Sequence, residues 1–233
     1  MIFQTGSKAK ATAQSTYCLN NLKQLQTAWK MYEGDHDDLF PPNISRTVAG
    51  NPQSLSNSWV LGNAQLDTDT TNIINGSLYS YAGSTAIYRC AADHAMVTGN
   101  GSLPHTRSYS VNAWLGSVFQ VYGQNWPASA PPGFILKTRE SLIITPSPSD
   151  AYAFIDDNER TIDDGLFIVG TISWYDYPAD RHGQGANLSF LDGHEEHKRW
   201  ADPKLGNPPP GSAPRPGGDA TDHDWLIDHS PTQ

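Results

Sequence analysis

The first 45 residues constrain the fold more than any other part of the chain. One apolar stripe runs through this polar segment and consists of Ala11, Cys18, Leu22, Leu25, Trp29 and Tyr32. From Cys18 onward the steps alternate between four and three, which places one side chain per turn on a single helix face. Gly34 and then Pro41-Pro42 supply helix-ending residues. Because such a helix must pack on something, we expect a helix over residues 1–34 with Leu25 and Trp29 buried.

The remainder reads as a β-rich head over residues 35–200. Candidate strands are 86–90, 107–115, 151–155 and 165–172, and a hairpin joins 186–191 to 194–200. Residues 44–75 look irregular, and 72–81 favour a short helix ending near Gly83. The Pro/Gly-rich residues 201–233 form a C-terminal extension of the same domain: 202–219 are expected to be extended and mobile, and 222–227 to dock back through Trp225 and Leu226. The predicted class is α+β, with a long N-terminal helix packed on an antiparallel sheet with long loops.

Composition narrows the functional classes. Hydrophobic residues make up 37% and aromatic residues 10% of the chain, which indicates a folded protein. The net charge of −9 argues against a nucleic-acid or anionic-membrane surface. The sequence contains no run of about 18 apolar residues and no recognisable signal peptide.

Several stretches carry a resemblance to a known family, in the family's own order. They are Cys18-Leu19-Asn20-Asn21-Leu22-Lys23-Gln24-Leu25, Phe40-Pro41, Tyr88-Arg89-Cys90, Arg107-Ser108-Tyr109-Ser110-Val111-Asn112, Ile155-Asp156-Asp157 and Trp174 through His182. The last element is His182, nine residues, then Asp192-Gly193. The chain thus resembles the head domain of bacterial pseudopilin-like proteins, which carry a prepilin-type N-terminal signal and a C-terminal motif of this spacing. Two departures are Ala91, where the family usually has proline, and the lack of the family's hydrophobic N-terminal segment.

The resemblance implies a structural, non-enzymatic role. The chain would be the head of an assembly subunit in a type II secretion pseudopilus or a related surface filament, with a pilin-like fold. Its partners would be other pseudopilin-like subunits and, through an apolar helix segment ahead of Ser7, the membrane. Its location would be the periplasm or cell surface, with an inner-membrane anchor in the precursor. On this view the start of the chain is expected to be a shortened form.

Cys18 and Cys90 are the two cysteines of the chain. One interpretation is a pair of buried thiols. The other, which suits an extracytoplasmic protein, is a disulfide that joins the helix to the head and stabilises the fold by ~4 kcal/mol in the chain-entropy model.

The motif formed by His182, Asp192 and Gly193 invites a catalytic pairing of the histidine and the aspartate. A strand over 187–191 would separate its ends by roughly 14 Å, which argues against that pairing. We therefore predict that Asp192-Gly193 is a type I′ turn and that His182 supports a loop. The alternative is that His182 and a carboxylate bind a metal.

The acidic loop is the densest run of oxygen ligands and includes Asp156, Asp157, Asn158, Glu159, Asp163 and Asp164. Calcium prefers six to eight carboxylate and carbonyl oxygens, so Ca²⁺ is the candidate cofactor here, although the spacing does not match an EF-hand. A solvated turn is the other interpretation.

Loop aromatics suggest a second functional class, an extracellular module that binds carbohydrate or another ligand. These residues are Tyr122, Trp126, Trp174, Tyr175 and Tyr177. Packing of the loops is the simpler use of such side chains. A hydrolase using the acidic loop is a third interpretation, but the sequence has no Gly-x-Ser-x-Gly motif, phosphate loop or zinc-protease motif.

Overall fold

The computed structural model describes residues 3–121, 124–126, 136–204 and 211–232. The helices are α1 (Phe3–Asp35), α2 (Thr71–Ile74), α3 (Tyr79–Ala82) and α4 (Gly218–Asp228), with 3-10 turns η1 (Thr85–Tyr88) and η2 (Glu140–Leu142). The strands are β1 (Asn43–Val48), β2 (Asn51–Ser54), β3 (Tyr109–Asn112), β4 (Ser117–Val121), β5 (Gln124–Trp126), β6 (Tyr152–Asp156), β7 (Leu166–Phe167), β8 (Val169–Gly170), β9 (Ser173–Trp174), β10 (Gly185–Phe190) and β11 (Glu195–Arg199). In the described chain, no helix is both long and apolar enough to cross a membrane.

A five-stranded sheet in the order β11-β10-β6-β3-β7 forms the centre of the molecule. Its strands pair antiparallel except for β3 and β7, which pair parallel. A second sheet has the order β2-β1-β4-β5, and β8 pairs with β9. The expected α+β class, a long helix on a mainly antiparallel sheet, is confirmed at this level.

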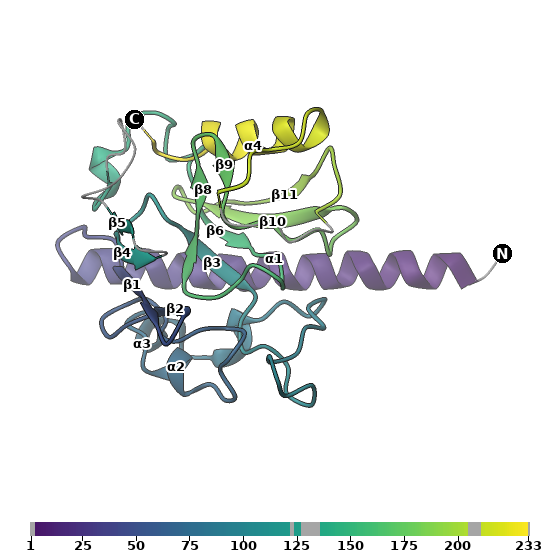
Figure 1. Ribbon diagram of the computed structural model, residues 1–233, viewed down its shortest axis with the longest axis horizontal. Helices are drawn as coiled ribbons and strands as arrows, with labels where there is room; N and C mark the ends of the chain where they lie inside the picture. The colour runs from purple at the N-terminus through teal and green to yellow at the C-terminus, as the bar shows by residue number, and fades with distance from the viewer. Residues whose placement is uncertain (1–2, 122–123, 127–135, 205–210, 233) are drawn as a thin grey trace.

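The helix α1 packs along one face of the central sheet, chiefly on β10, β11 and β6, and contacts α3 and η1 on its other side (Figure 1). Leu25 and Trp29 are both fully buried, as the stripe predicts. The Trp29 ring meets Phe154 of β6 edge-on, with centroids 5.5 Å apart. Burial of the stripe therefore joins α1 to the middle of the sheet. Truncation of a large apolar side chain at this interface should lower the free energy of unfolding by ~2–5 kcal/mol.

The face of β10 toward α1 is polar, whereas its other face is apolar. Ser189 donates to the side chain of Gln26 at 3.0 Å, and Asn187 donates to the backbone oxygen of Ser15 at 3.2 Å. Leu188 points instead into a second core cluster that includes Leu226 of α4. The period-two alternation of the strand thus serves two buried faces, one under α1 and one under α4.

The first part of α1 projects past the head (Figure 1). Residues 9–13 are all exposed, so Ala11 does not belong to the buried stripe and that part of the prediction is wrong. Packing begins with Gln14, whose side chain donates to the backbone oxygen of Ala91 at 3.0 Å. The same helix therefore has a packed part and an unpacked part.

Four local predictions need correction. Residues 44–75 contain the antiparallel β1–β2 pair and α2, because Gly50 supplies a positive φ of 85° at the turn. The expected strand 86–90 is η1, since Ser84 accepts a hydrogen bond from the Ala86 amide and caps a 3-10 turn. The segment 72–81 divides into α2 and α3, although α3 does end at Gly83 with φ 68°. The segment 165–172 divides between β7 and β8, which belong to different sheets.

The C-terminal segment closes the second core. Leu226 is fully buried, as expected, and Trp225 is partly buried under the ammonium of Lys198, which is 4.3 Å from its ring centroid. Lys204 is also buried and its Nζ donates to Asp219 at 3.1 Å and to Asp222 at 2.7 Å. These ion pairs hold α4 on the sheet.

Candidate functional site

Three side chains that are far apart in the sequence meet where α1 packs on the sheet. The two sulfurs of Cys18 and Cys90 and a ring nitrogen of His182 lie within 4.8 Å of one another. Cys90 Sγ is 3.2 Å from His182 Nε2, and all three residues are buried. Among the described residues, this is the one group of three or more histidine, cysteine or carboxylate ligands that converges so closely.

Each member is positioned by a different element. Cys18 lies on the packed face of α1. Cys90 follows η1, and its amide donates to Ser108 Oγ at 3.1 Å. His182 precedes β10 in a tight turn, in which Gly183 and Gln184 both have positive φ (70° and 63°). This backbone conformation suits glycine and turns the chain back before the strand begins.

Asp156, at the end of β6, completes the surroundings of the histidine. Its Oδ2 is 3.3 Å from His182 Nε2 and has no hydrogen-bond partner within the described chain. Its Oδ1 pairs with Arg181 Nη2, which also donates to the Asp157 carbonyl at 2.8 Å. The Asp156 side chain has no exposed surface, so one of its carboxylate oxygens is buried and aimed at the histidine.

Proton affinities in the cluster are shifted by these contacts. A hydrogen bond with Cys90 lowers the pKa of Cys18, and the same hydrogen bond together with burial raises the pKa of Cys90. Burial alone would lower the pKa of His182, but its close contacts with the Asp156 carboxylate and with Cys90 outweigh burial and raise this pKa to about 9. The contacts within the cluster therefore favour a charged imidazole at His182 and a neutral thiol at Cys90.

The geometry does not suit a nucleophilic triad. In such a triad the base uses one ring nitrogen toward the nucleophile and the other toward the orienting carboxylate. Here Cys90 and Asp156 both face the same nitrogen of His182, and the cysteine has no open surface. The arrangement instead joins α1, the segment after η1 and the segment before β10. Both cysteines are free thiols in the structure, and their closeness keeps the disulfide a standing prediction.

The acidic loop is organised around a buried arginine. The guanidinium of Arg107, fully buried, donates to the backbone oxygens of Asp163 (2.6 Å) and Asp164 (2.5 Å). Burial lowers the pKa of Arg107, and the surrounding carboxylates oppose that effect. Two carbonyls that a calcium ion would need are thus already hydrogen-bonded.

The side chains of this loop point in separate directions. Asp157 accepts hydrogen bonds from Ser110 (2.8 Å) and Thr161 (3.1 Å), and burial raises its pKa to about 7. Asp164 accepts from Ser45 and from the Leu166 amide. Other members have partners as well: Asn158 accepts from the Arg160 amide, Asp163 from the Asp164 amide, and Asp156 pairs with Arg181. Among the described residues, no three carboxylates of this loop converge on a common point as the calcium prediction requires.

Asp192 and Gly193 lie at the far end of β10 from His182, as the strand length predicts. The expected type I′ turn is wrong, because only Gly193 of the two has a positive φ (98°). The Gly193 amide donates to the Phe190 carbonyl and the Phe190 amide to the His194 carbonyl, which is the three-residue loop with a glycine bulge. Asp192 Oδ1 accepts from the His194 amide at 3.1 Å and therefore stabilises the loop.

The loop aromatics are divided in their environments. Trp174 and Tyr177 are buried in the second core cluster, and the Trp174 indole donates to Asp219 at 3.2 Å. Tyr175 is partly buried against Leu166 and Ile168. Tyr122 and the Trp126 side chain lie outside what the structure describes. Trp174 and Tyr177 pack the interior and are not available to stack on a glycan.

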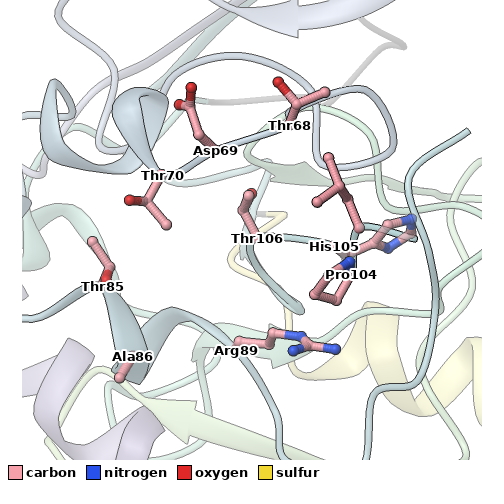
Figure 2. A pocket seen from close by; sticks show the side chains of 10 residues that line it. Thr68, Asp69, Thr70, Thr85, Ala86, Arg89, Pro104, His105 and Thr106 are labelled. Carbon is pink, nitrogen blue, oxygen red and sulfur yellow. The ribbon is translucent and has the colours of Figure 1, made fainter. Parts of the chain in front are cut away.

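Apart from the cluster, a surface hollow lies between the α2 region and η1 (Figure 2). This cavity of about 290 Å³ has Thr68, Asp69 and Thr70 on one side and Arg89 on the opposite side. His105 and Thr106 also line it, and burial lowers the pKa of His105. Nδ1 of His105 and Oγ1 of Thr106 have no partner among the described residues.

The sequence pointed to the acidic loop and to His182, but not to the convergence of His182 with both cysteines. The one indication in the sequence was the alternative that His182 and a carboxylate bind a metal. That alternative did not include the two cysteines. Comparisons with protein-family models, with curated proteins and with solved structures find no match.

Proposed function

We propose that this chain is the head of a pseudopilin-like subunit of a type II secretion system or related surface filament, with a pilin-like arrangement of helix and sheet. The observation that carries the proposal is the divided helix α1. Its later part is buried against the sheet, while residues 9–13 are exposed on all sides and project past the head (Figure 1). An assembly subunit uses such a projecting helix to pack against the helices of its neighbours.

A projecting helix needs contacts with another surface to be stable. A short helix without tertiary contacts is marginal in water, because few hydrogen bonds offset the cost of ordering its backbone. In α1 the packed part nucleates the helix, so the projecting part can continue it at small cost. Contacts with a neighbouring helix would then stabilise it much further than propensity does. Ala9 and Ala13 lie four residues apart, on one face, and their small side chains permit close approach.

The resemblance supports the same role from another direction. The stretches that resemble pseudopilin-like proteins include the packed part of α1 and the final His182-to-Gly193 motif, and both contribute to one scaffold of helix and sheet. The resemblance also implies an extracytoplasmic location, an inner-membrane anchor in the precursor and a neighbouring pseudopilin as partner. Cell fractionation of the full-length protein tests the location.

Site-specific crosslinking tests the assembly role. A photo-crosslinking amino acid replaces Ala11 in the full-length protein produced in its own cells, and Ile144, an 83% exposed residue of the head, serves as the matched control position. We expect Ala11 to crosslink to another copy or to a related subunit, and Ile144 to do so much less. Equal, background crosslinking at both positions in assembled cells would contradict the proposal.

A further inference from the structure

We propose that Cys18, Cys90, His182 and Asp156 form a closed zinc site that fastens α1 to the head in the thiol form of the protein. This inference does not depend on the proposed assembly role. Two thiolates and an imidazole are the ligands that zinc prefers, whereas calcium and magnesium require oxygen ligands. The set draws on α1, the segment after η1, the segment before β10, and β6, so a bound ion would join four parts of the fold.

The distances fit a tetrahedral ion. Zinc bonds of about 2.0 Å to nitrogen and oxygen and about 2.3 Å to sulfur place the nitrogen about 3.3 Å from the oxygen and about 3.5 Å from a sulfur. The structure has 3.3 Å between His182 Nε2 and Asp156 Oδ2 and 3.2 Å between His182 Nε2 and Cys90 Sγ. The second sulfur, Cys18 Sγ, lies within 4.8 Å of both Cys90 Sγ and a ring nitrogen of His182. Asp156 lies outside that 4.8 Å group, so its carboxylate would move toward the two sulfurs to complete the tetrahedron.

An unpartnered oxygen points independently to a cation. Oδ2 of Asp156 is buried and accepts no hydrogen bond from the described residues, while Oδ1 pairs with Arg181. A buried carboxylate oxygen without a partner is costly. A zinc ion beside it would remove that cost.

Charge also balances with the ion bound. Two thiolates and the Asp156 carboxylate carry three negative charges, and Zn²⁺ with the Arg181 guanidinium carries three positive charges. Binding releases the two thiol protons and the imidazolium proton of His182 to solvent, and no oxidant or reductant is required. The Arg181 guanidinium would thus neutralise the one negative charge that remains on the ligands after Zn²⁺ binds.

The surroundings favour thiolate and exclude water. The Ala92 amide donates to Cys90 Sγ at 3.4 Å, a contact that stabilises a charged sulfur. The cysteines and His182 are buried, which is typical of structural zinc sites that have no open coordination position. A surface cavity of about 310 Å³ is lined by Ala92, Glu159 and Arg181, among others, but by none of the four proposed ligands.

Metal analysis of the purified protein tests the site. The chain is unfolded in reductant, refolded with zinc, passed over a weak chelator and analysed for zinc and protein content. We expect one zinc per chain. Cys90→Ser and His182→Gln are each expected to weaken zinc binding by more than about 100-fold in chelator competition. His194→Gln is the matched control, because this exposed histidine lies at the far end of β10, where its ring contacts Asp192 and Phe190, and the variant should retain one zinc.

Cobalt provides a readout that does not depend on variants that fail to fold. Co²⁺ added to the reduced wild-type protein should give the intense visible bands of a tetrahedral ion and a thiolate-to-cobalt charge-transfer band. Six-coordinate cobalt without the thiolate band would overturn the proposal. So would wild-type protein that carries no zinc after reductive refolding, or zinc that both Cys90→Ser and His182→Gln retain at full affinity.

Discussion

The acidic loop and the cysteine–histidine cluster differ in whether residues that are close in the sequence are also close in the fold. The loop residues are neighbours in the chain, yet their side chains separate, because Arg107, Ser110, Thr161 and Ser45 each engage one part of the loop. The cluster residues come from three distant segments, yet their ligand atoms meet within 4.8 Å. Density of ligands in a sequence is therefore a weaker guide to a site than the topology that brings distant segments together.

Removal of Arg107, which organises the acidic loop, should lower the stability of the protein more than the other changes below. Arg107→Met keeps most of the side-chain bulk but leaves the carbonyls of Asp163 and Asp164 and nearby carboxylates without their cation. We expect a loss of ~3–5 kcal/mol in the free energy of unfolding, measured by urea denaturation. The control is Arg46→Met, at an exposed position of β1, which should change the free energy of unfolding by less than about 0.5 kcal/mol. Equal stability of both variants would mean that the loop does not depend on the arginine.

Shortening the α1 stripe should affect the cluster more than the loop. Leu25→Ala removes a fully buried side chain and should cost ~2–5 kcal/mol, with faster reaction of Cys18 with a thiol reagent under native conditions. Met31→Ala, at a 52% exposed position of the same helix, is the control and should alter neither. A Leu25→Ala protein that melts like the parent would contradict the packed helix.

The hairpin at Asp192 should respond separately from His182. Gly193→Val places a β-branched residue at φ 98° and should cost ~1–3 kcal/mol in a thermal melt. Asp192→Asn should be nearly silent, since the amide oxygen can still accept from the His194 amide. If Asp192→Asn cost as much as Gly193→Val, the carboxylate would have a role beyond this loop.

Calcium should have the smallest effect. The sequence predicts that calcium raises the melting temperature, but the loop oxygens already accept hydrogen bonds that binding would have to break. We therefore expect a gain below about 1 kcal/mol at millimolar calcium, read from paired melts with calcium and with chelator. A larger, chelator-reversible gain would show that the loop rearranges into a cation site and would erase the contrast with the cluster.

Much of the architecture could be predicted because it follows from local periodicity. The alternating steps from Cys18 to Tyr32 identify the buried face of α1, and the pattern on either side of Asp192-Gly193 identifies the β10–β11 hairpin. The turn type was mistaken because Leu191 joins the loop, which allows a negative φ at Asp192. The β1–β2 pair was missed because its strands are mostly polar and lie partly at the surface.

The candidate site was less predictable for a different reason. A cluster formed by Cys18, Cys90 and His182 depends on long-range packing of α1 against β10, which no local pattern encodes. Likewise, nothing adjacent to the acidic loop in sequence indicates that Arg107 would fill it. Ligand sets within one segment can be read locally, whereas sets across segments require the sheet order.

The position of α1 has a consequence for the order in which the protein can fold during synthesis. The helix α1 is made before all of these strands, but its main partner β10 begins only at Gly185 and β11 ends at Arg199. For most of translation Leu22, Leu25 and Trp29 therefore lack the surface that covers them. Contacts of such long sequence separation form slowly and leave apolar surface open to wrong partners. The nascent chain should thus depend on a chaperone or another temporary cover until β10 and β11 emerge.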